Sequence, residues 1–227
     1  MRVVQTIITV LWMAAVSLLR LGELHGMIPG YVLPIVLVLM SVSVFLLARR
    51  APESCGECRL DFSGAVPFAL LFLGAVLLLG ASVMQFSQNT GNGLLLLEAV
   101  AGAVLLLHAF AERAGKQLPA DMLLVPVVAQ VVRLIFTYRT DAANPDLGAY
   151  YIGMLATAAV TLGLLLFVSY YFRLAKPRVL TAMSAVTAIL STACAAEGQS
   201  LASAGIASAW ALVFLAVLAA FRREETK

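Results

Sequence analysis

The stretch SGAVPFALLFLGAVLLLGASVMQF, which runs from Ser63 to Phe86, contains no charged residue. It is long enough to cross the hydrocarbon core of a bilayer as a helix, which takes about 20 apolar residues. The stretch Ile28–Ala48 has the same character. Because these apolar runs are continuous and do not alternate with polar residues, they favour membrane helices over the strands of a membrane barrel.

The composition of the whole chain also indicates a lipid environment. Of its 227 residues, 62% are hydrophobic and 12% are charged, whereas a soluble domain carries about 25% charged residues. So few charges cannot cover a folded surface of this size in water, and we therefore expect lipid around most of it. The formal net charge is +3, and no basic stripe with interleaved aromatics is present, so nucleic-acid binding has no support.

Turn-forming residues divide the chain into about eight candidate spans. Gly26 and Pro29 mark the separation of the first two spans, and Pro145 and Pro177 each lie between two later spans. A polar, glycine-rich hairpin occupies residues 87–93. The first span could be a signal peptide, but residues 20–23 lack a small-x-small cleavage site, so we interpret it as a retained helix. The expected spans are residues 3–21, 28–48, 63–86, 93–111, 122–138, 148–172, 179–196 and 201–221.

The basic residues predict the orientation of this all-α, polytopic transmembrane helix bundle. With eight spans, only Arg20 and Arg139 lie on one side, and Arg133 lies within a span. The other side holds Arg2, Arg49, Arg50, Arg59, Arg113, Lys116, Arg173, Lys176, Arg178, Arg222, Arg223 and Lys227. Since lysine and arginine are retained in cytoplasmic loops, we expect both the N-terminus and the C-terminus to be cytoplasmic.

A spacing pattern suggests an internal repeat. Arg20 and Tyr31 flank the first external turn eleven residues apart, and Arg139 and Tyr150 flank the third external turn at the same spacing. Four spans in each half would give a parallel 4+4 repeat with both halves in one orientation. Chance also produces two matched residues, so both explanations stay open. The halves would be residues 1–117 and 118–227 of a single transmembrane domain, 1–227.

Two charged residues lie well inside the expected spans, Glu98 in the fourth and Arg133 in the fifth. Each is about six residues from the outer end of its span, roughly 9 Å deep. Because a charge within a bilayer is expensive and seeks a partner, we expect an ion pair, with Gln130 completing the hydrogen bonds of Arg133. The pair is either a structural clamp between helices or a site in which Arg133 holds an anionic group and Glu98 a cationic or hydroxyl group.

Polar residues around the external turns extend this site. Arg20 would pair with Glu23, and Arg139 with Asp141, while Tyr150 lies at the outer boundary. They either line a vestibule that opens outward or belong to ordinary solvated loops. The candidate ligand-binding residues are Glu98, Arg133, Gln130, Arg139, Tyr150 and Arg20.

Three further features leave alternatives open. Small and hydroxyl-bearing residues fill the seventh span and begin the eighth, which predicts tight packing at the bundle centre or a hydroxyl-lined pathway. His108 either relays protons or reaches water at the interface. Cys55 and Cys58 form a C-x-x-C pair without a second pair of ligands, so we expect no metal site.

These features favour a protein of the bacterial cytoplasmic (inner) membrane that binds or transports a small polar or charged solute through an externally open vestibule. The alternative is a non-catalytic partner, either an assembly or a sensor subunit. An intramembrane enzyme ranks last, because catalysis needs a nucleophile, base or metal set in mutual reach and the spans offer one glutamate, one arginine and one peripheral histidine. We expect no cofactor and no catalytic residue. The expected partners are the lipid bilayer, a small-molecule ligand, and another membrane protein or further copies of the chain.

Overall fold

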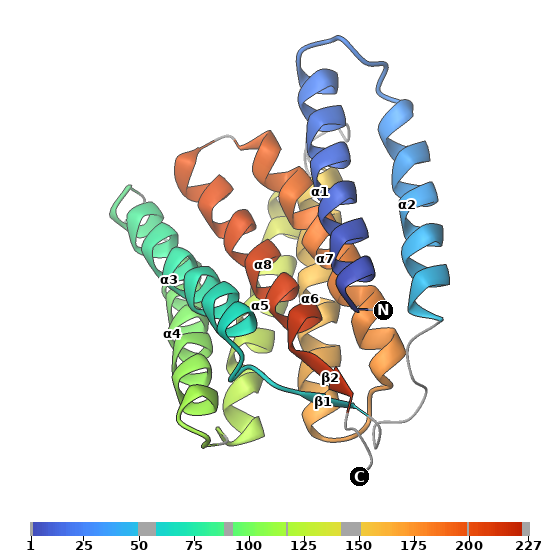
Figure 1. The fold of residues 1–227 in the computed structure, drawn as a ribbon. Coiled ribbons are helices and arrows are strands. Elements are labelled where there is room, and N and C mark those ends of the chain that lie inside the picture. The colour runs from blue at the N-terminus through green and yellow to red at the C-terminus, as the bar shows by residue number, and fades with distance from the viewer. Residues whose placement is uncertain are drawn as a thin grey trace.

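The fold is a bundle of helices with one short two-stranded ladder (Figure 1). The computed structural model describes residues 2–49, 58–88, 93–116, 118–141, 151–198 and 200–223. The helices are α1 (Arg2–Leu24), α2 (Val32–Ala48), α3 (Ala65–Gln88), α4 (Leu94–Arg113), α5 (Leu124–Asp141), α6 (Tyr151–Tyr171), α7 (Pro177–Glu197) and α8 (Leu201–Ala220). The strands are β1 (Cys58–Leu60) and β2 (Phe221–Arg223), and a 3-10 turn, η2 (Ala120–Leu123), precedes α5.

Seven of these helices are long and apolar enough to cross a membrane, which supports a multi-pass membrane protein. The exception is α2, an apolar helix of 17 residues. Its rise of roughly 26 Å is a little less than the hydrocarbon thickness of about 30 Å. The helical bundle predicted from the sequence is confirmed, and the expectation of eight complete crossings depends on α2.

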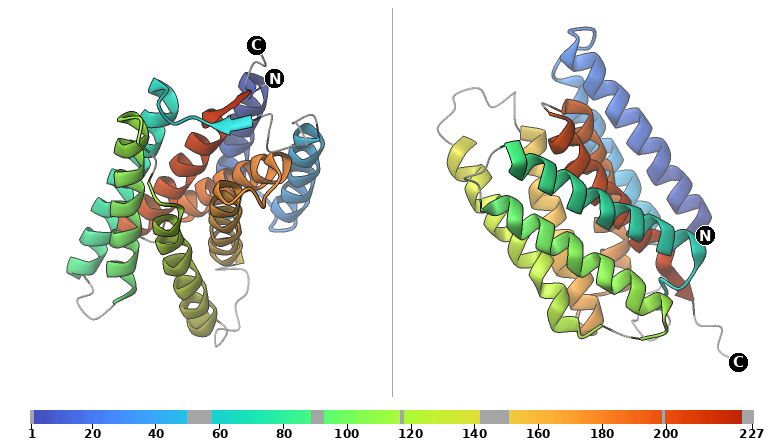
Figure 2. Two further views of the ribbon diagram at one scale, coloured as in Figure 1. Left: turned by 90° about the horizontal axis from the view of Figure 1, so that it is seen from below. Right: turned by 90° about the vertical axis from the view of Figure 1, so that its left-hand side faces the viewer.

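Six helices form a closed ring, and two lie outside it. Around the ring each helix packs on the next in chain order from α3 to α8, and α8 returns to α3. The hairpin of α1 and α2 attaches to the outside of this ring through α7, and Figure 2 shows it at the periphery. This arrangement does not support the 4+4 repeat, because α1 and α2 lie outside the ring while their expected counterparts, α5 and α6, belong to it.

The most buried helices are α7 and α8, as their small residues predicted. The Thr187 hydroxyl on α7 donates a hydrogen bond of 3.0 Å to the Ala159 carbonyl on α6. A Cβ atom added at Gly163 on α6 would lie 2.6 Å from the ring of Phe214 on α8. Small residues thus bring α6, α7 and α8 into close contact, which is a common way for membrane helices to associate without a hydrophobic driving force.

Glycines end two of the helices. Gly26 follows α1 with φ +68°, and Gly115 follows α4 with φ +69°. After α4, the Lys116 amide donates to the Ala111 carbonyl and the Gly115 amide to the Glu112 carbonyl. This is the Schellman arrangement, in which a left-handed residue satisfies the last helical carbonyls and glycine is favoured. The turn at Gly26 therefore falls where the sequence predicted it, whereas the one at Gly115 was not singled out.

The ladder joins two distant parts of the chain. β1 pairs with β2 antiparallel, with Leu60 opposite Phe221, and the Asp61 amide donates to the Ala220 carbonyl at 2.8 Å. The sequence did not predict these strands, and Phe221 was assigned to the last span. Strands of three residues carry no usable periodicity. We refer to this end of the bundle as the ladder end, and to the end with the α1–α2 turn as the opposite end.

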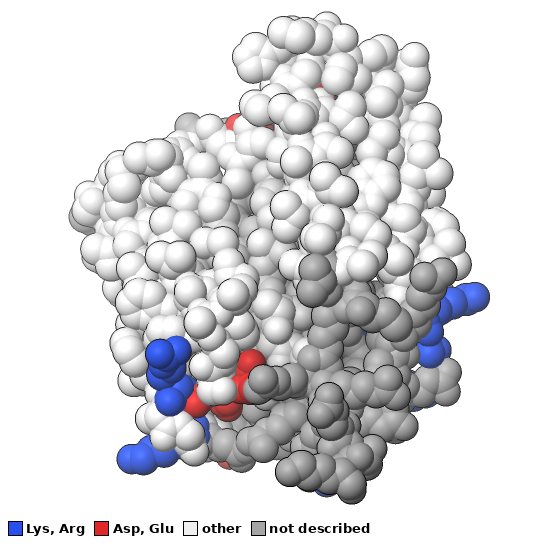
Figure 3. All heavy atoms as spheres, in the orientation of Figure 1, with Lys and Arg blue, Asp and Glu red and all other residues white. Residues whose placement is uncertain are grey.

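The outer surface is apolar along the helices. Leu11, Leu18 and Val38 are more than half exposed on the α1–α2 hairpin. On the face shown in Figure 3, the lysines and arginines gather toward the ladder end below a broad uncharged surface. A surface of this kind suits hydrocarbon better than water. That the ladder end faces the cytoplasm stays a prediction from the positive-inside rule.

Candidate functional site

A buried ion pair joins α4 to α5 near the opposite end. The Nη1 atom of Arg133 lies 2.5 Å from Oε1 of Glu98. The side chain of Glu98 is 2% exposed, and that of Arg133 is 30% exposed. The predicted pair is therefore confirmed as a contact between neighbouring helices, with its carboxylate inside the protein and its guanidinium within reach of the surface.

Gln130 serves a different partner from the one expected. Its Nε2 atom donates 2.9 Å to Oε1 of Glu98, the same oxygen that Arg133 contacts, so the expectation that it completes the hydrogen bonds of Arg133 was wrong. The amide lies one turn from Arg133 on α5, and it is neutral and almost fully buried. We infer a physical reason from the charges. The hydrogen bond from the Gln130 amide NH2 to the buried, charged carboxylate is stronger than the one its neutral amide oxygen would accept from Arg133.

The two oxygens of the Glu98 carboxylate differ in their contacts. Oε2 is buried and accepts no hydrogen bond from the part of the chain that the structure describes. A carboxylate oxygen has two acceptor positions, and leaving a buried charged acceptor unsatisfied costs more than about 1–3 kcal/mol. The site is therefore asymmetric, since Oε1 holds two donors while Oε2 holds none.

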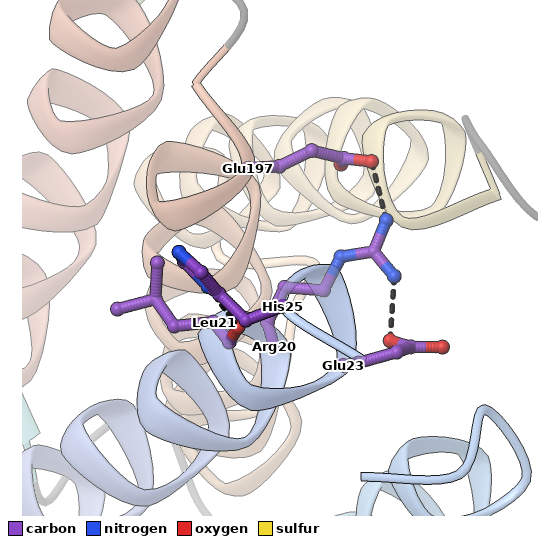
Figure 4. Close-up of polar contacts among 5 residues, drawn as sticks. All are labelled: Arg20, Leu21, Glu23, His25 and Glu197. Atoms are coloured by element: carbon purple, nitrogen blue, oxygen red, sulfur yellow. Dashed lines mark hydrogen bonds and ion pairs between the residues drawn. The ribbon is translucent and has the colours of Figure 1, made fainter. Parts of the chain in front are cut away.

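A second ionic group connects α1 to α7 (Figure 4). Arg20 donates through Nη2 to Oε1 of Glu197 at 2.5 Å and through Nη1 to Oε2 of Glu23 at 2.6 Å. Its guanidinium also lies over the ring of Tyr151 on α6, 5.6 Å from the centroid. The Arg20 side chain is 3% exposed. The expected contact with Glu23 is confirmed, and the contacts with Glu197 and Tyr151 are additional.

Cys194 lies on the last turn of α7, three residues before Glu197. It is near enough to Glu197, Arg133 and Arg20 for their charges to act on it. The last turn of α7 is therefore close to both ionic groups. Nothing in the sequence singled out Cys194, because a lone cysteine among small residues fits ordinary helix packing.

The chain matches no protein-family model, no curated protein and no solved structure.

The remaining predicted residues fall into two groups. Arg139 is exposed near the end of α5, so it does not enter the buried pair. Tyr150 lies outside the described residues, and so does the side chain of Asp141, the expected partner of Arg139. The vestibule that these residues would line stays a prediction.

His108 belongs to an aromatic cluster near the ladder end. The imidazole is 1% exposed, and its Nε2 atom lies 3.1 Å from the hydroxyl of Tyr171 on α6. The rings of Phe62 and Phe167 lie 5.4 and 6.0 Å from it, edge to face. The interpretation that His108 reaches water at the interface is wrong, because Phe62 from the segment after β1 packs over it.

Proposed function

We propose that this protein binds a small polar solute at the Glu98–Arg133 pair, as the solute-capturing or transporting component of a cell membrane, the inner membrane of a bacterium. Arg133 offers an anion contact and Glu98 a counter-charge or hydrogen-bond acceptor. The observation that carries the proposal is the unpartnered Oε2 atom of the buried Glu98. A structural clamp would use both oxygens of its carboxylate, whereas a binding site leaves an acceptor for its ligand.

Access to the pair supports binding from the opposite end. Arg133 retains 30% of its side-chain exposure, so part of this side chain is accessible from outside the bundle. Near the ladder end, His108 and Phe62 are almost fully buried. The solute would therefore enter from the opposite end, which the positive-inside rule places outside the cell.

The test is a thermal-shift screen of the purified protein against amines, carboxylates, zwitterions and sugars. A ligand at 100 times its Kd stabilises the folded state by about 2.7 kcal/mol. We expect one chemical class to raise the melting temperature of the wild type, and we expect Arg133→Gln and Glu98→Gln to lose that increase. Lys116→Gln is the matched control, because it removes a charge from an exposed position at the ladder end.

Two results would count against the proposal. If no class stabilises the wild type more than the Glu98→Gln/Arg133→Gln double variant, the pair binds no solute from the panel and acts as a clamp. If a second membrane protein co-purifies in a fixed ratio while every class fails, the alternative of an assembly or sensor subunit replaces the proposal.

A further inference from the structure

Three helices of the bundle end in the same hydrogen-bonded turn, but only two of them carry the expected glycine. After α6, the amides of Arg173 and Leu174 donate to carbonyls three and five residues earlier. The turns after α1 and α4 have the same two bonds, with Gly26 and Gly115 at the left-handed position. Arg173 takes that position after α6, with φ +58°. Because a side chain in the left-handed region crowds the following carbonyl, the arginine carries a cost that glycine would avoid.

Contacts within the protein do not account for this arginine. A cation is favourable at the C-terminal end of a helix, but α4 obtains one from Arg113 in its last helical turn and still has glycine after the helix. The Arg173 side chain is exposed, and it forms no ion pair or hydrogen bond with the described residues. Its guanidinium therefore points to a group outside the chain.

Apolar side chains beside this arginine continue the lipid-facing surface of α6. Leu174 is 80% exposed. Phe172 is also exposed, and it ends a stripe on one face of α6 that includes Leu155, Leu162 and Leu165. Since such a face suits hydrocarbon, Phe172 and Leu174 lie where the surface of the bundle passes from the hydrocarbon to the lipid headgroups.

The turn between α6 and α7 is positively charged. Arg173 and Lys176 are exposed, and Arg178 follows on the first turn of α7. The sequence has no acidic residue from 147 to 196. The matching turn after α4 differs, because its exposed Lys116 has one acidic residue four positions before it and another five positions after it. The α6–α7 turn thus combines cations with exposed apolar side chains, which the α4 turn does not.

We infer that the α6–α7 turn binds the phosphate of an anionic phospholipid, with Arg173 and Lys176 at the headgroup and Leu174 in the adjoining hydrocarbon. Basic side chains are attracted to an anionic membrane surface, and apolar residues beside them anchor in the interface. The turn lies at the ladder end (Figure 1), which the positive-inside rule assigns to the cytoplasmic leaflet with its negative surface potential. This inference does not depend on the Glu98–Arg133 site.

A fluorescent label at position 174 measures which lipid lies next to the turn. Leu174→Cys in a cysteine-free background is labelled with bimane and reconstituted in phosphatidylcholine vesicles. About a fifth of the lipid is brominated, either as phosphatidylglycerol or as phosphatidylcholine, and bromine quenches the label only at short range. The ratio of the two quenching constants gives the preference for the anionic lipid. We expect a preference of about tenfold, since each basic residue contributes up to about fivefold. A label at Met122→Cys, an exposed apolar position in η2, should show almost none.

Variants assign the preference to the two basic residues. Arg173→Gly introduces the residue that α1 and α4 have at this position, so the fold is retained. We expect Arg173→Gly and Lys176→Gln each to lower the preference about threefold, and Arg173→Lys to stay within about twofold of the parent protein, because the charge is kept. Lys116→Gln is the matched control, since it removes one exposed charge from the corresponding turn after α4, and it should leave the preference unchanged.

Four results would overturn the inference. An unchanged preference in Arg173→Gly would assign the arginine to the end of α6 alone. Equal losses in Lys116→Gln and Lys176→Gln would show a general effect of net charge. Loss of the preference when inorganic phosphate is added at constant ionic strength would identify a soluble phosphate as the ligand. Equal quenching by the two lipids in the parent protein would leave the turn to a protein partner. The thermal-shift test of the Glu98–Arg133 site is unaffected by any of these results.

Discussion

The Glu98–Arg133 pair predicts an asymmetric response to neutralising each partner. In Arg133→Gln the carboxylate of Glu98, 2% exposed, keeps its charge and the single hydrogen bond from Gln130. Removing one partner of a buried pair costs about 3–5 kcal/mol. We expect a value near the lower limit, about 3 kcal/mol, because Arg133 is 30% exposed and its replacement lets water approach.

In Glu98→Gln the uncompensated charge belongs to the partner that can reach the surface. Arg133 can turn toward solvent or lipid headgroups, and the new amide oxygen still accepts from Gln130. We expect a cost of about 1 kcal/mol, the value of one hydrogen bond. The double variant leaves no charge and should also cost about 1 kcal/mol, so the coupling between the two positions is about 3 kcal/mol.

The assay is equilibrium unfolding in mixed detergent micelles, with all four proteins compared in one double-mutant cycle. Arg139→Gln, an exposed position on the same helix, is the control and should change the free energy of unfolding by less than about 0.5 kcal/mol. The reasoning is refuted if Glu98→Gln destabilises at least as much as Arg133→Gln, or if the two costs simply add in the double variant.

Two further predictions concern topology and packing. In a cysteine-free background, Met27→Cys should react with an impermeant maleimide in intact cells. Arg49→Cys and Lys116→Cys should react only after the cells are permeabilised. If Met27→Cys and Arg49→Cys react from the same side of the membrane, α2 does not cross it. Gly163→Ala should lower the free energy of unfolding by about 1–3 kcal/mol, because the new Cβ would lie 2.6 Å from the buried ring of Phe214. Gly80→Ala, with no atom within 4 Å of the new Cβ, is its control, and equal losses for the two variants would contradict the packing argument.

The contact between Glu98 and Arg133 was predictable because each is a lone charge at similar depth in one of two consecutive spans. Consecutive antiparallel helices are usually neighbours, so the depth and the charge of the two residues were enough to predict their contact. The bridge from Arg20 to Glu197 was not predictable in the same way. Its partners lie on α1 and α7, and pairing them requires the packing of the outer hairpin, which hydropathy does not encode. The sequence contained one hint of this bridge, since Arg20 and Glu197 both fall at the expected outer boundary of the membrane.

The unpartnered oxygen of Glu98 could not be predicted from residue types. A glutamate beside an arginine and a glutamine offers two oxygens to several donors, and the sequence suggests that all are satisfied. In the structure Arg133 and Gln130 converge on Oε1 alone. Which oxygen each donor reaches depends on the rotamers and on the separation of α4 and α5.

The two ends of the bundle differ in the chemistry of what they bury, and this bears on the choice between capture and transport. The opposite end buries charged side chains, one of which keeps partial access to the surface. The ladder end buries an aromatic cluster around His108, covered by Phe62 and connected through the β1–β2 ladder to the end of α8. On the proposed function, a solute held at Glu98 would enter and leave toward the opposite end. Passage toward the ladder end would require the aromatic cluster to separate, so a transport cycle would need a second arrangement of Phe62, whereas capture for a partner would need only the arrangement described.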